Sequence, residues 1–554
     1  MLKTYWNILV FILLITSCGV KKSLHDIPDV SNYNQTIPER NQISDSTFTT
    51  ENGLLTKNKY GQWELYVSGD PYQIGLQTGS LSQELMAKQE TAFLGKVEEL
   101  VPSKTKQYLL RKVLAWYNRK MYLHVPEEYK SEILGVSKYA GDSYDYVADD
   151  YLRLLYFHSA HDIGHALQDL ALVGCSSFAA WGDKTEDSSL IIGRNFDFYA
   201  GDDFAKNKII AFIKPTNGYN FMSVTWAGMM GVVSGMNDQG LTVTINAGKS
   251  DIPLIAKTPI SILTREILQY ASTIDEAIAI AKKRQVFVSE SIFIGSAKDN
   301  HAVTIEVSPN NFGVYNVENS NQLICSNHFQ SDAYATDENN LKQIAESHSQ
   351  YRFERMEELL SETPKLTVEK AVSILRNTEG LKNKAIGYGN EKALNQLLAH
   401  HGVVFKPEQG LVWVSANPYQ LGEFVAYNLH TIFKNEPSET AAKSFHNSEL
   451  SIEADPFQFT QAYLDYETYR VLSREISKAI STDNHVEQNV LDELIAVNPN
   501  YWEAYYLVGT YYYKKHYYTA ALQAFEKAQT KEITTVPDQE QIDWYIKKIK
   551  NKLK

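Results

Sequence analysis

The stretch that decides the fold is residues 174–198, which read GCSSFAAWGDKTEDSSLIIGRNFDF. Two apolar runs flank a polar turn at residues 182–188, a pattern that is typical of a β-hairpin. The first strand begins at a thiol, Cys175, and the second carries Arg194 and Asp197. Strands of about seven to nine residues bring Gly193–Asp197 back alongside Cys175. Because a nearby guanidinium favours the thiolate, the hairpin predicts a nucleophilic cysteine.

Short apolar runs separated by Gly, Asn and Asp turns continue after this hairpin. Amphipathic helices are expected at 260–271, 273–283, 350–362 and 367–376. Helices placed between groups of strands predict an α+β fold with helices packed on a pair of sheets, and not a parallel doubly wound sheet. The expected strands after the hairpin are 208–213, 221–226, 231–236, 241–247, 291–296, 302–307, 312–316, 323–326, 411–415 and 423–428.

The chain has 554 residues, which is too long for one compact core. Residues 53–174 are predicted to be mainly helical, and residues 175–450 to form the catalytic domain. Residues 455–554 return to helices. Within that tail Gly509 and Phe525 fall at the spacing of a tetratricopeptide repeat, and a plain helical hairpin is the alternative. The tail is also a candidate binding surface for a protein partner.

The first residues are typical of an export signal. A positive start and a short apolar run at residues 1–17 end at Cys18, and the run is far below the ~20 residues of a membrane-spanning helix. Ile15-Thr16-Ser17-Cys18 resembles the lipobox of bacterial lipoproteins, in which the cysteine is lipidated. Residues 18–52 are then expected to be a polar tether. The resemblance implies an exported, lipid-anchored protein of the bacterial cell envelope, and a soluble secreted protein is the alternative.

Charge and cysteine content narrow the functions further. The formal charge is −13 and no long Lys/Arg run offsets it, which argues against nucleic acid as a partner. If Cys18 is lipidated, only Cys175 and Cys325 remain, which is too few for a disulfide framework. A bridge between these two is conceivable, but a protein that needs a free thiolate would avoid it.

The hairpin resembles the start of the choloylglycine-hydrolase and penicillin-acyltransferase group of N-terminal-nucleophile hydrolases, peptidase family C45 in particular. Acid ceramidase and bile-salt hydrolases have a similar Cys…Gly-Arg-Asn-x-Asp hairpin. Three later segments strengthen the resemblance and together extend it over about residues 63–429. They are Gly235-Met236-Asn237-Asp238-Gln239-Gly240-Leu241 with Ile245-Asn246-Ala247, Ser326-Asn327-His328-Phe329, and Ser349-Gln350-Tyr351-Arg352-Phe353.

The resemblance implies roles for these positions. Asn246 maps onto an oxyanion-hole donor, Asn327 onto an asparagine near the nucleophile, and Arg352 onto an arginine that approaches the cysteine. Arg355 is a second candidate for that arginine. The implied fold is a four-layer αββα sandwich, preceded here by a helical pro-region and followed by the small all-α tail. No metal or organic cofactor is implied.

In this family the free α-amine of the nucleophile serves as general base. Cys175 has 174 residues before it, so its nitrogen belongs to a peptide bond and cannot accept a proton. The resemblance therefore implies self-cleavage between Gly174 and Cys175, and glycine offers little hindrance to attack on its carbonyl. The expected activity is hydrolysis or transfer of an acyl group from a small N-acyl amide through a thioester.

Two rival functions and two rival sites remain open. A non-catalytic lipoprotein scaffold and a phospholipase-B-like esterase are the alternative functions. His158, His161 and His165 lie at helical spacing and could bind zinc, although no His-Glu-x-x-His motif is present. The pair His400-His401 is expected to have a loop or capping role.

Overall fold

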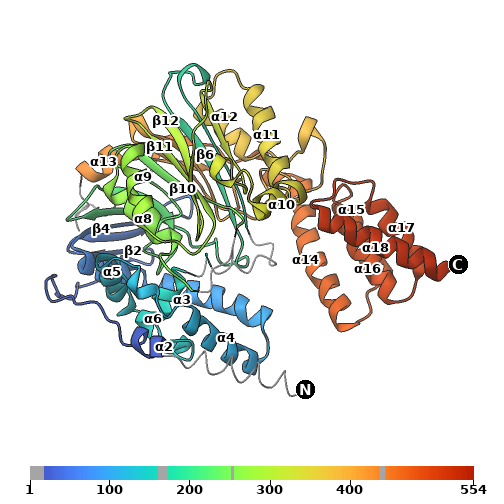
Figure 1. The fold of residues 1–554 in the computed structure, drawn as a ribbon, viewed down its shortest axis with the longest axis horizontal. Coiled ribbons are helices and arrows are strands. Elements are labelled where there is room, and N and C mark those ends of the chain that lie inside the picture. Colours follow the sequence, from blue (N-terminus) through green and yellow to red (C-terminus); the bar gives the residue numbers. More distant parts are fainter. Residues whose placement is uncertain (1–17, 160–161, 163–172, 251–254, 436–442) are drawn as a thin grey trace.

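The structure, a computed structural model, describes residues 18–159, 162, 173–250, 255–435 and 443–554. Two β-sheets lie face to face at its centre (Figure 1). One has eleven strands in the order β1-β2-β3-β4-β7-β8-β9-β10-β11-β12-β13, and the other has seven in the order β14-β5-β6-β15-β16-β17-β18. Paired strands are antiparallel, except that β4 and β7 run parallel.

Over residues 173–428 the strand bounds match the expected pattern closely, except for one strand at residues 401–406 that was not expected. The larger sheet contains β1 (Asn41–Ser44), β2 (Thr47–Thr50), β3 (Gly53–Lys57), β4 (Trp63–Gly69), β7 (Ile209–Pro215), β8 (Phe221–Thr225), β9 (Ser234–Asn237), β10 (Leu241–Ala247), β11 (Glu290–Ser296), β12 (His301–Val307) and β13 (Phe312–Tyr315). The smaller sheet contains β5 (Val173–Ala180), β6 (Ile191–Phe198), β14 (Gln322–Cys325), β15 (His401–Lys406), β16 (Leu411–Ser415), β17 (Phe424–Asn428) and β18 (Asn447–Ile452).

Helices pack on both sheets. On the larger sheet α8 (Ile260–Tyr270) and α9 (Ile274–Lys283) contact β9 to β12, and on the smaller sheet α11 (Ser349–Ser361) and α12 (Val368–Leu375) contact β5, β6, β14 and β15. Side chains alternate along the strands. On β11, for example, Phe293 lies in the core between the sheets, whereas Ile292 and Ile294 belong to the core under α8 and α9. The expected α+β class is confirmed. Two short helices, α10 (Glu338–Glu346) and α13 (Leu429–Lys434), complete this part.

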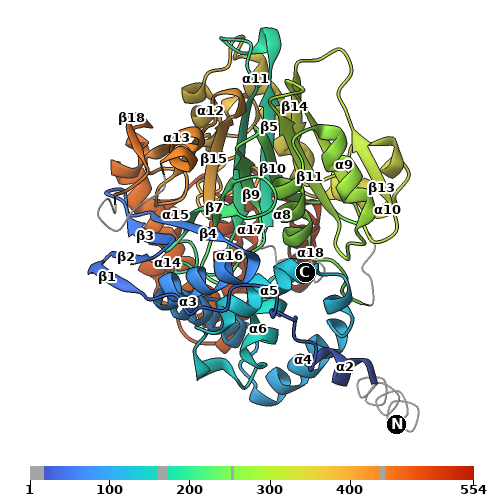
Figure 2. The same ribbon diagram turned by 90° about the vertical axis from the view of Figure 1, so that its left-hand side faces the viewer.

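The N-terminal segment is built into the larger sheet and does not stand apart from it. Its helices α3 (Pro71–Leu100), α4 (Lys104–Tyr117), α5 (Glu127–Ser137) and α6 (Asp150–Phe157) gather at one end of the sheets (Figures 1 and 2). Its four strands β1 to β4 join the catalytic strands through the β4–β7 pair. The expectation of a tether over residues 18–52 is therefore wrong for residues 41–50. Phe48 is buried there against the core, in a strand too short to stand out in a polar stretch.

The tail is helical, as expected. It consists of α14 (Gln461–Thr482), α15 (Gln488–Val497), α16 (Trp502–Lys514), α17 (Tyr518–Ala528) and α18 (Val536–Leu553), and Figure 1 shows it beside the sheets. Gly509 lets α16 and α17 pack closely, since a Cβ there would lie 3.0 Å from the Phe525 ring. The assignment of the tail as a tetratricopeptide repeat stays a prediction.

Near the chain start, α2 spans Cys18–Ser23. Among the described residues no helix is long and apolar enough to cross a membrane.

Candidate active site

The β5–β6 hairpin places the expected nucleophile beside its expected partners. The register pairs Gly174 with Asp197 and Ser177 with Arg194. Because side chains alternate along a strand, Cys175 and Arg194 lie on one face of the sheet and Asp197 on the other. Arg194 Nη2 lies 3.7 Å from Cys175 Sγ. The guanidinium and the thiol thus face the space between the two sheets together.

The backbone of Cys175 is held by two side chains from distant parts of the sequence. The Cys175 N–H donates to Asn327 Oδ1 over 3.0 Å, and the Cys175 carbonyl accepts from Arg352 over 2.6 Å. Arg352 also donates to Asn327 Oδ1 over 2.5 Å and to Ser176 Oγ over 2.9 Å. These bonds form one fully buried network around the third residue of β5.

The same network distinguishes the two candidate arginines on α11. Arg355 follows Arg352 by three residues, so the two side chains leave the helix about 60° apart. Arg355 bonds Glu358, Asn377 and Asn383 instead. Of the two, Arg352 is the one that reaches Cys175.

Burial determines the protonation state of the Cys175 thiol. It raises the pKa of Cys175 to about 11, although the Arg194 guanidinium opposes the shift. At neutral pH the thiol is therefore protonated, and the neighbouring nitrogen is a peptide N–H that cannot act as a base. Cys325 is also free and buried, and burial raises its pKa too.

The two asparagines reach the site from β10 and from the segment after β14. Asn246 accepts from Ser177 Oγ over 2.8 Å, and its Nδ2 lies 3.2 and 3.3 Å from the carbonyls of Cys325 and Ser326. Asn327 donates through Nδ2 to the Ala247 carbonyl over 2.9 Å. In the uncut chain both side-chain amides therefore already bond to backbone carbonyls beside the nucleophile.

Arg194 is linked through Ser234 to the histidine pair His400-His401. His401 was expected in a loop or cap, but it begins β15, a strand absent from the expected set, next to β6. Its Nε2 lies 2.8 Å from Ser234 Oγ, which also accepts from Arg194. The Nδ1 atoms of His400 and His401 lie 2.8 Å apart. The local signal for this strand is the apolar run 403–405, which is short and follows His400-His401-Gly402.

The direction of these bonds follows from the arginine, which can only donate. Since Ser234 Oγ accepts from Arg194, its own hydrogen is free for His401 Nε2. His401 Nδ1–H then donates to His400 Nδ1, and both rings are neutral because burial lowers their pKa values. The chain of bonds fixes Arg194 between the two sheets and thereby its approach to the thiol.

Asp197 lies on the other face of β6. Its carboxyl is fully buried, and neither oxygen has a hydrogen-bond partner among the described residues. Burial raises its pKa to about 7, against the opposing effect of the Arg352 and Arg194 guanidinium groups. A new ammonium at Cys175 would add a third nearby positive charge and lower that pKa again.

We expect Asp197→Asn to flatten the pH dependence of stability in an uncut Cys175→Ala background. A carboxyl whose pKa is raised in the folded state keeps its proton where the unfolded chain has lost it. The free energy of unfolding therefore falls as pH rises from about 4 to about 7 and then stays low. Asparagine cannot ionise, so thermal unfolding at pH 8 should occur roughly a few degrees higher. The control is Asp203→Asn in an exposed loop, and equal pH profiles for the two variants would contradict the assignment.

The contacts of His158 argue against its role as a zinc ligand. His158 Nδ1 lies 2.8 Å from the Leu154 carbonyl, and its Nε2 accepts from the Met230 N–H over 2.9 Å. Both ring nitrogens are thus engaged in holding α6 to the loop before β9. His161 and His165 lie outside the described residues. Within the described part of the chain, no group of three or more His, Cys, Asp or Glu side chains could hold a metal ion.

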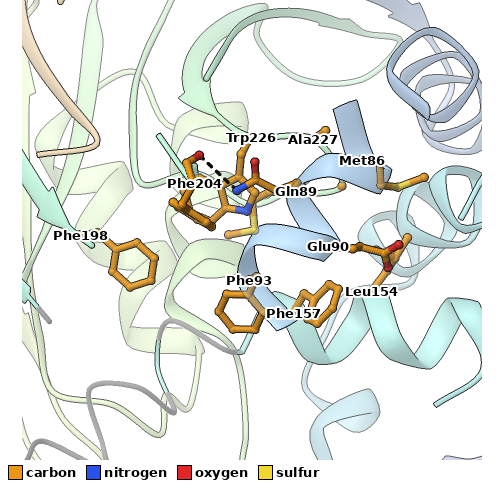
Figure 3. Close-up of a pocket in the computed structure, with 12 residues that line it drawn as sticks. Met86, Gln89, Glu90, Phe93, Leu154, Phe157, Phe198, Phe204, Trp226 and Ala227 are labelled. Atoms are coloured by element: carbon orange, nitrogen blue, oxygen red, sulfur yellow. Dashed lines mark hydrogen bonds between the residues drawn. The ribbon is translucent and has the colours of Figure 1, made fainter. Parts of the chain in front are cut away.

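An aromatic pocket lies at the end of the hairpin that carries Cys175 (Figure 3). Phe198, which pairs with Val173, lines it and stacks on Phe196, the cross-strand neighbour of Cys175. The free volume is about 30 Å³, enough for one or two water molecules. The N-terminal helices supply one wall and the catalytic part the other: Met86, Gln89, Glu90, Phe93, Leu154 and Phe157 face Phe198, Phe204, Trp226, Ala227, Gly228 and Met229.

Comparison with known families adds an independent observation. Residues 184–416 match the family described as acyl-coenzyme A:6-aminopenicillanic acid acyl-transferase. The match points to the N-terminal-nucleophile group of hydrolases and acyltransferases that act on amides. It contains Arg194, Asn246, Asn327 and Arg352 but begins after Cys175, so it does not test the nucleophile.

Individual relatives cover part of the chain. It is 27% identical over 282 residues to an uncharacterized protein of Archaeoglobus fulgidus, which covers 47% of this chain and 46% of that protein. It is 26% identical over 230 residues to the N-acylethanolamine-hydrolyzing acid amidase of Caenorhabditis elegans, covering 39% and 61%. The chain thus spans about half the length of the curated relatives it matches.

A solved structure of a mutant conjugated bile acid hydrolase from Clostridium perfringens is 15% identical and covers 46% of this chain and 93% of that one, with a TM-score of 0.32. A score this low does not establish a shared fold.

Proposed function

We propose that this chain is a cysteine-nucleophile amide hydrolase or N-acyltransferase of the N-terminal-nucleophile class, with the four-layer αββα sandwich of that class. Cleavage between Gly174 and Cys175 would activate it. The observation that carries the proposal is the environment of Cys175. Its N–H is held by Asn327, its carbonyl by Arg352, and its thiol faces Arg194.

Cleavage would convert the peptide nitrogen of Cys175 into an α-amine that can take the thiol proton. Asn327 Oδ1 already accepts from this nitrogen and is placed to orient the amine. Asp197, on the neighbouring strand, is the acid closest in register to the new chain end. Arg194 then favours the thiolate that attacks the substrate carbonyl.

The tetrahedral oxyanion requires hydrogen-bond donors directed at it. We assign this role to the Nδ2 groups of Asn246 and Asn327, as the family resemblance implies. In the uncut chain these groups bond to the carbonyls of residues 325, 326 and 247. Each amide nitrogen carries two hydrogens, so Asn327, which bonds one carbonyl, keeps a donor for the oxyanion, whereas Asn246 has to release one of its two carbonyl bonds.

The aromatic pocket supports an apolar acyl group as the part of the substrate that is recognised. Phe198 lines the pocket and stacks on Phe196, the cross-strand neighbour of Cys175, and the narrow free volume of the pocket requires the helical wall to move when substrate enters. An apolar N-acyl amide is also compatible with the similarity to the nematode N-acylethanolamine-hydrolyzing acid amidase. Water and an amine both attack a thioester, so either can be the acyl acceptor.

We further propose lipidation of Cys18 in a bacterial cell envelope, and a protein partner for the helical tail.

The test is selective alkylation with iodoacetamide. Cys175 in the cleaved protein should react much faster than Cys325, since the new ammonium and Arg194 both favour its thiolate. Loss of activity against a panel of N-acyl amides, including acyl-amino acids and phenoxyacetyl amides, should follow the labelling of Cys175. Cys325→Ala is the matched control and should retain activity and its sensitivity to the reagent. Equal labelling of both thiols with no turnover of any amide would favour a binding scaffold.

A further inference from the structure

A glutamine outside the described network lies directly against the expected cleavage site. A Cβ placed on Gly174 would lie 2.6 Å from Gln396 Nε2 and 3.1 Å from Gln396 Oε1, closer than real side chains tolerate. The amide of Gln396 therefore lies against the backbone of Gly174, and a side chain at residue 174 would displace it. Gln396 is 2% exposed, and its Nε2 has no hydrogen-bond partner among the described residues.

An acceptor without a partner lies on the same side of the sheet. Asp197 is the cross-strand partner of Gly174, and cross-strand partners direct their side chains to the same face. This is the face opposite the Cys175 thiol. One glycine is thus flanked by a buried donor, Gln396, and a buried acceptor, Asp197, each without a partner in the described part of the chain. A buried polar group without a hydrogen-bond partner is unfavourable, so both groups destabilise the uncut chain.

We propose that Gln396 is a catalytic residue of the self-cleavage and that the helical tail presents it to Gly174. This inference rests on the proposed function. Cys175 Sγ forms a bond to the Gly174 carbonyl carbon, the bond from that carbon to the Cys175 nitrogen breaks, and the thiol proton passes to this nitrogen. Water then hydrolyses the thioester, which restores the thiol and leaves a Gly174 carboxylate. Negative charge develops on the Gly174 oxygen in both steps.

Gln396 and Asp197 would each gain a hydrogen-bond partner from one of the two chain ends that cleavage produces. Gln396 Nε2–H donates to the Gly174 oxygen as it becomes charged, and Asp197 accepts from the new ammonium of Cys175. Cleavage thereby provides partners for groups that have none in the precursor, which favours the cut state. The donor acts on the oxygen that carries the charge in the transition state, which is where a hydrogen bond accelerates a reaction.

The tail holds the segment that carries Gln396. Tyr466 on α14 donates to the Leu397 carbonyl over 3.2 Å, and Glu532 pairs with Lys392 over 2.7 Å. Asn390 donates to the Glu532 carbonyl over 2.9 Å. The closest fit is at Gly387, which has a φ of +86° and packs against Tyr501 so that a Cβ would lie 2.4 Å away. Because the tail is made last, Gln396 reaches its position only after the whole chain has been synthesised.

The experiment follows cleavage of newly synthesised full-length chain over time, by the appearance of the fragment that starts at Cys175. Gln396→Met keeps the volume and removes the donor, and it should slow cleavage about ten-fold or more. Tyr466→Phe, which loses only the bond to residue 397, should slow it several-fold. The control is Gln420→Met, since Gln420 is equally buried but lies against Gly402. Circular dichroism and the melting temperature establish that each variant is folded.

The outcomes separate this inference from the proposed function. If the wild-type chain is never cut, the N-terminal-nucleophile mechanism itself is wrong. If the wild type is cut and Gln396→Met is cut at the same rate, Gln396 has no catalytic role and only this inference fails. If Gln396→Met is misfolded, Gln396→Glu provides the second test. Its carboxylate next to Asp197 should slow cleavage at pH 8 and less at pH 6, whereas equal rates at wild-type level would overturn the inference.

Discussion

Purified wild-type protein is expected to consist of two associated fragments, about residues 18–174 and 175–554, whereas Cys175→Ala should remain one chain. The thiol is the only group of Cys175 that can attack the Gly174 carbonyl, so alanine should abolish both cleavage and amide hydrolysis. Intact mass spectrometry gives the fragment masses. The same spectrum would show a diacylated Cys18 at the start of the first fragment if the lipobox is used.

The fragments should stay together because the cut does not separate two independent cores. Strand β4 of the first fragment pairs along its whole length with β7 of the second. A fully buried ion pair joins Glu132 to Arg265 across the same boundary at 2.8 Å. Native mass spectrometry should therefore find one complex. Cys325→Ala should be cut like the wild type, and a full-length wild-type chain that hydrolyses amides would rule out the mechanism.

The elements with strong local signals were predictable from the sequence. The hairpin of residues 174–198 and the strands after it alternate or end at glycine and asparagine turns, and their bounds agree with the structure to within a few residues. The return of residues 193–197 alongside Cys175 followed from the length of two strands alone, and the register in the structure places Arg194, but not Asp197, on the face of the thiol. Predictions of this kind succeed because register within a hairpin depends only on the turn.

Interactions between distant segments were not predictable in the same way. Nothing near Gln396 in the sequence indicates that it lies against Gly174, and Ser234 looks like an ordinary strand residue. Strand β15 was missed because its apolar run is brief and follows two histidines. The strands at residues 41–50 were missed because they depend on the sheet that they join. In each case tertiary packing outweighed a weak local preference.

Replacement of the predicted oxyanion donor should have the second largest effect. Asn246→Ala should lower kcat, and kcat/KM by the same factor, roughly a hundred-fold, the scale observed for removal of one such donor. KM should change little, because the oxyanion exists only after the thiol has attacked. Steady-state kinetics on the best N-acyl amide of the panel would measure both constants, and a mass spectrum would establish the extent of cleavage in the same sample.

A structural explanation of that loss has to be separated from a catalytic one, since Asn246 also bonds to the carbonyls of residues 325 and 326. Ser177→Ala is the matched control. It removes the 2.8 Å bond to Asn246 Oδ1 and leaves the Nδ2 donor in place, at a position that is equally buried. Ser177→Ala should therefore cost a similar amount of stability but only a few-fold in kcat. If both variants lose activity in proportion to their melting temperatures, Asn246 holds the sheets together and the oxyanion is stabilised by other groups.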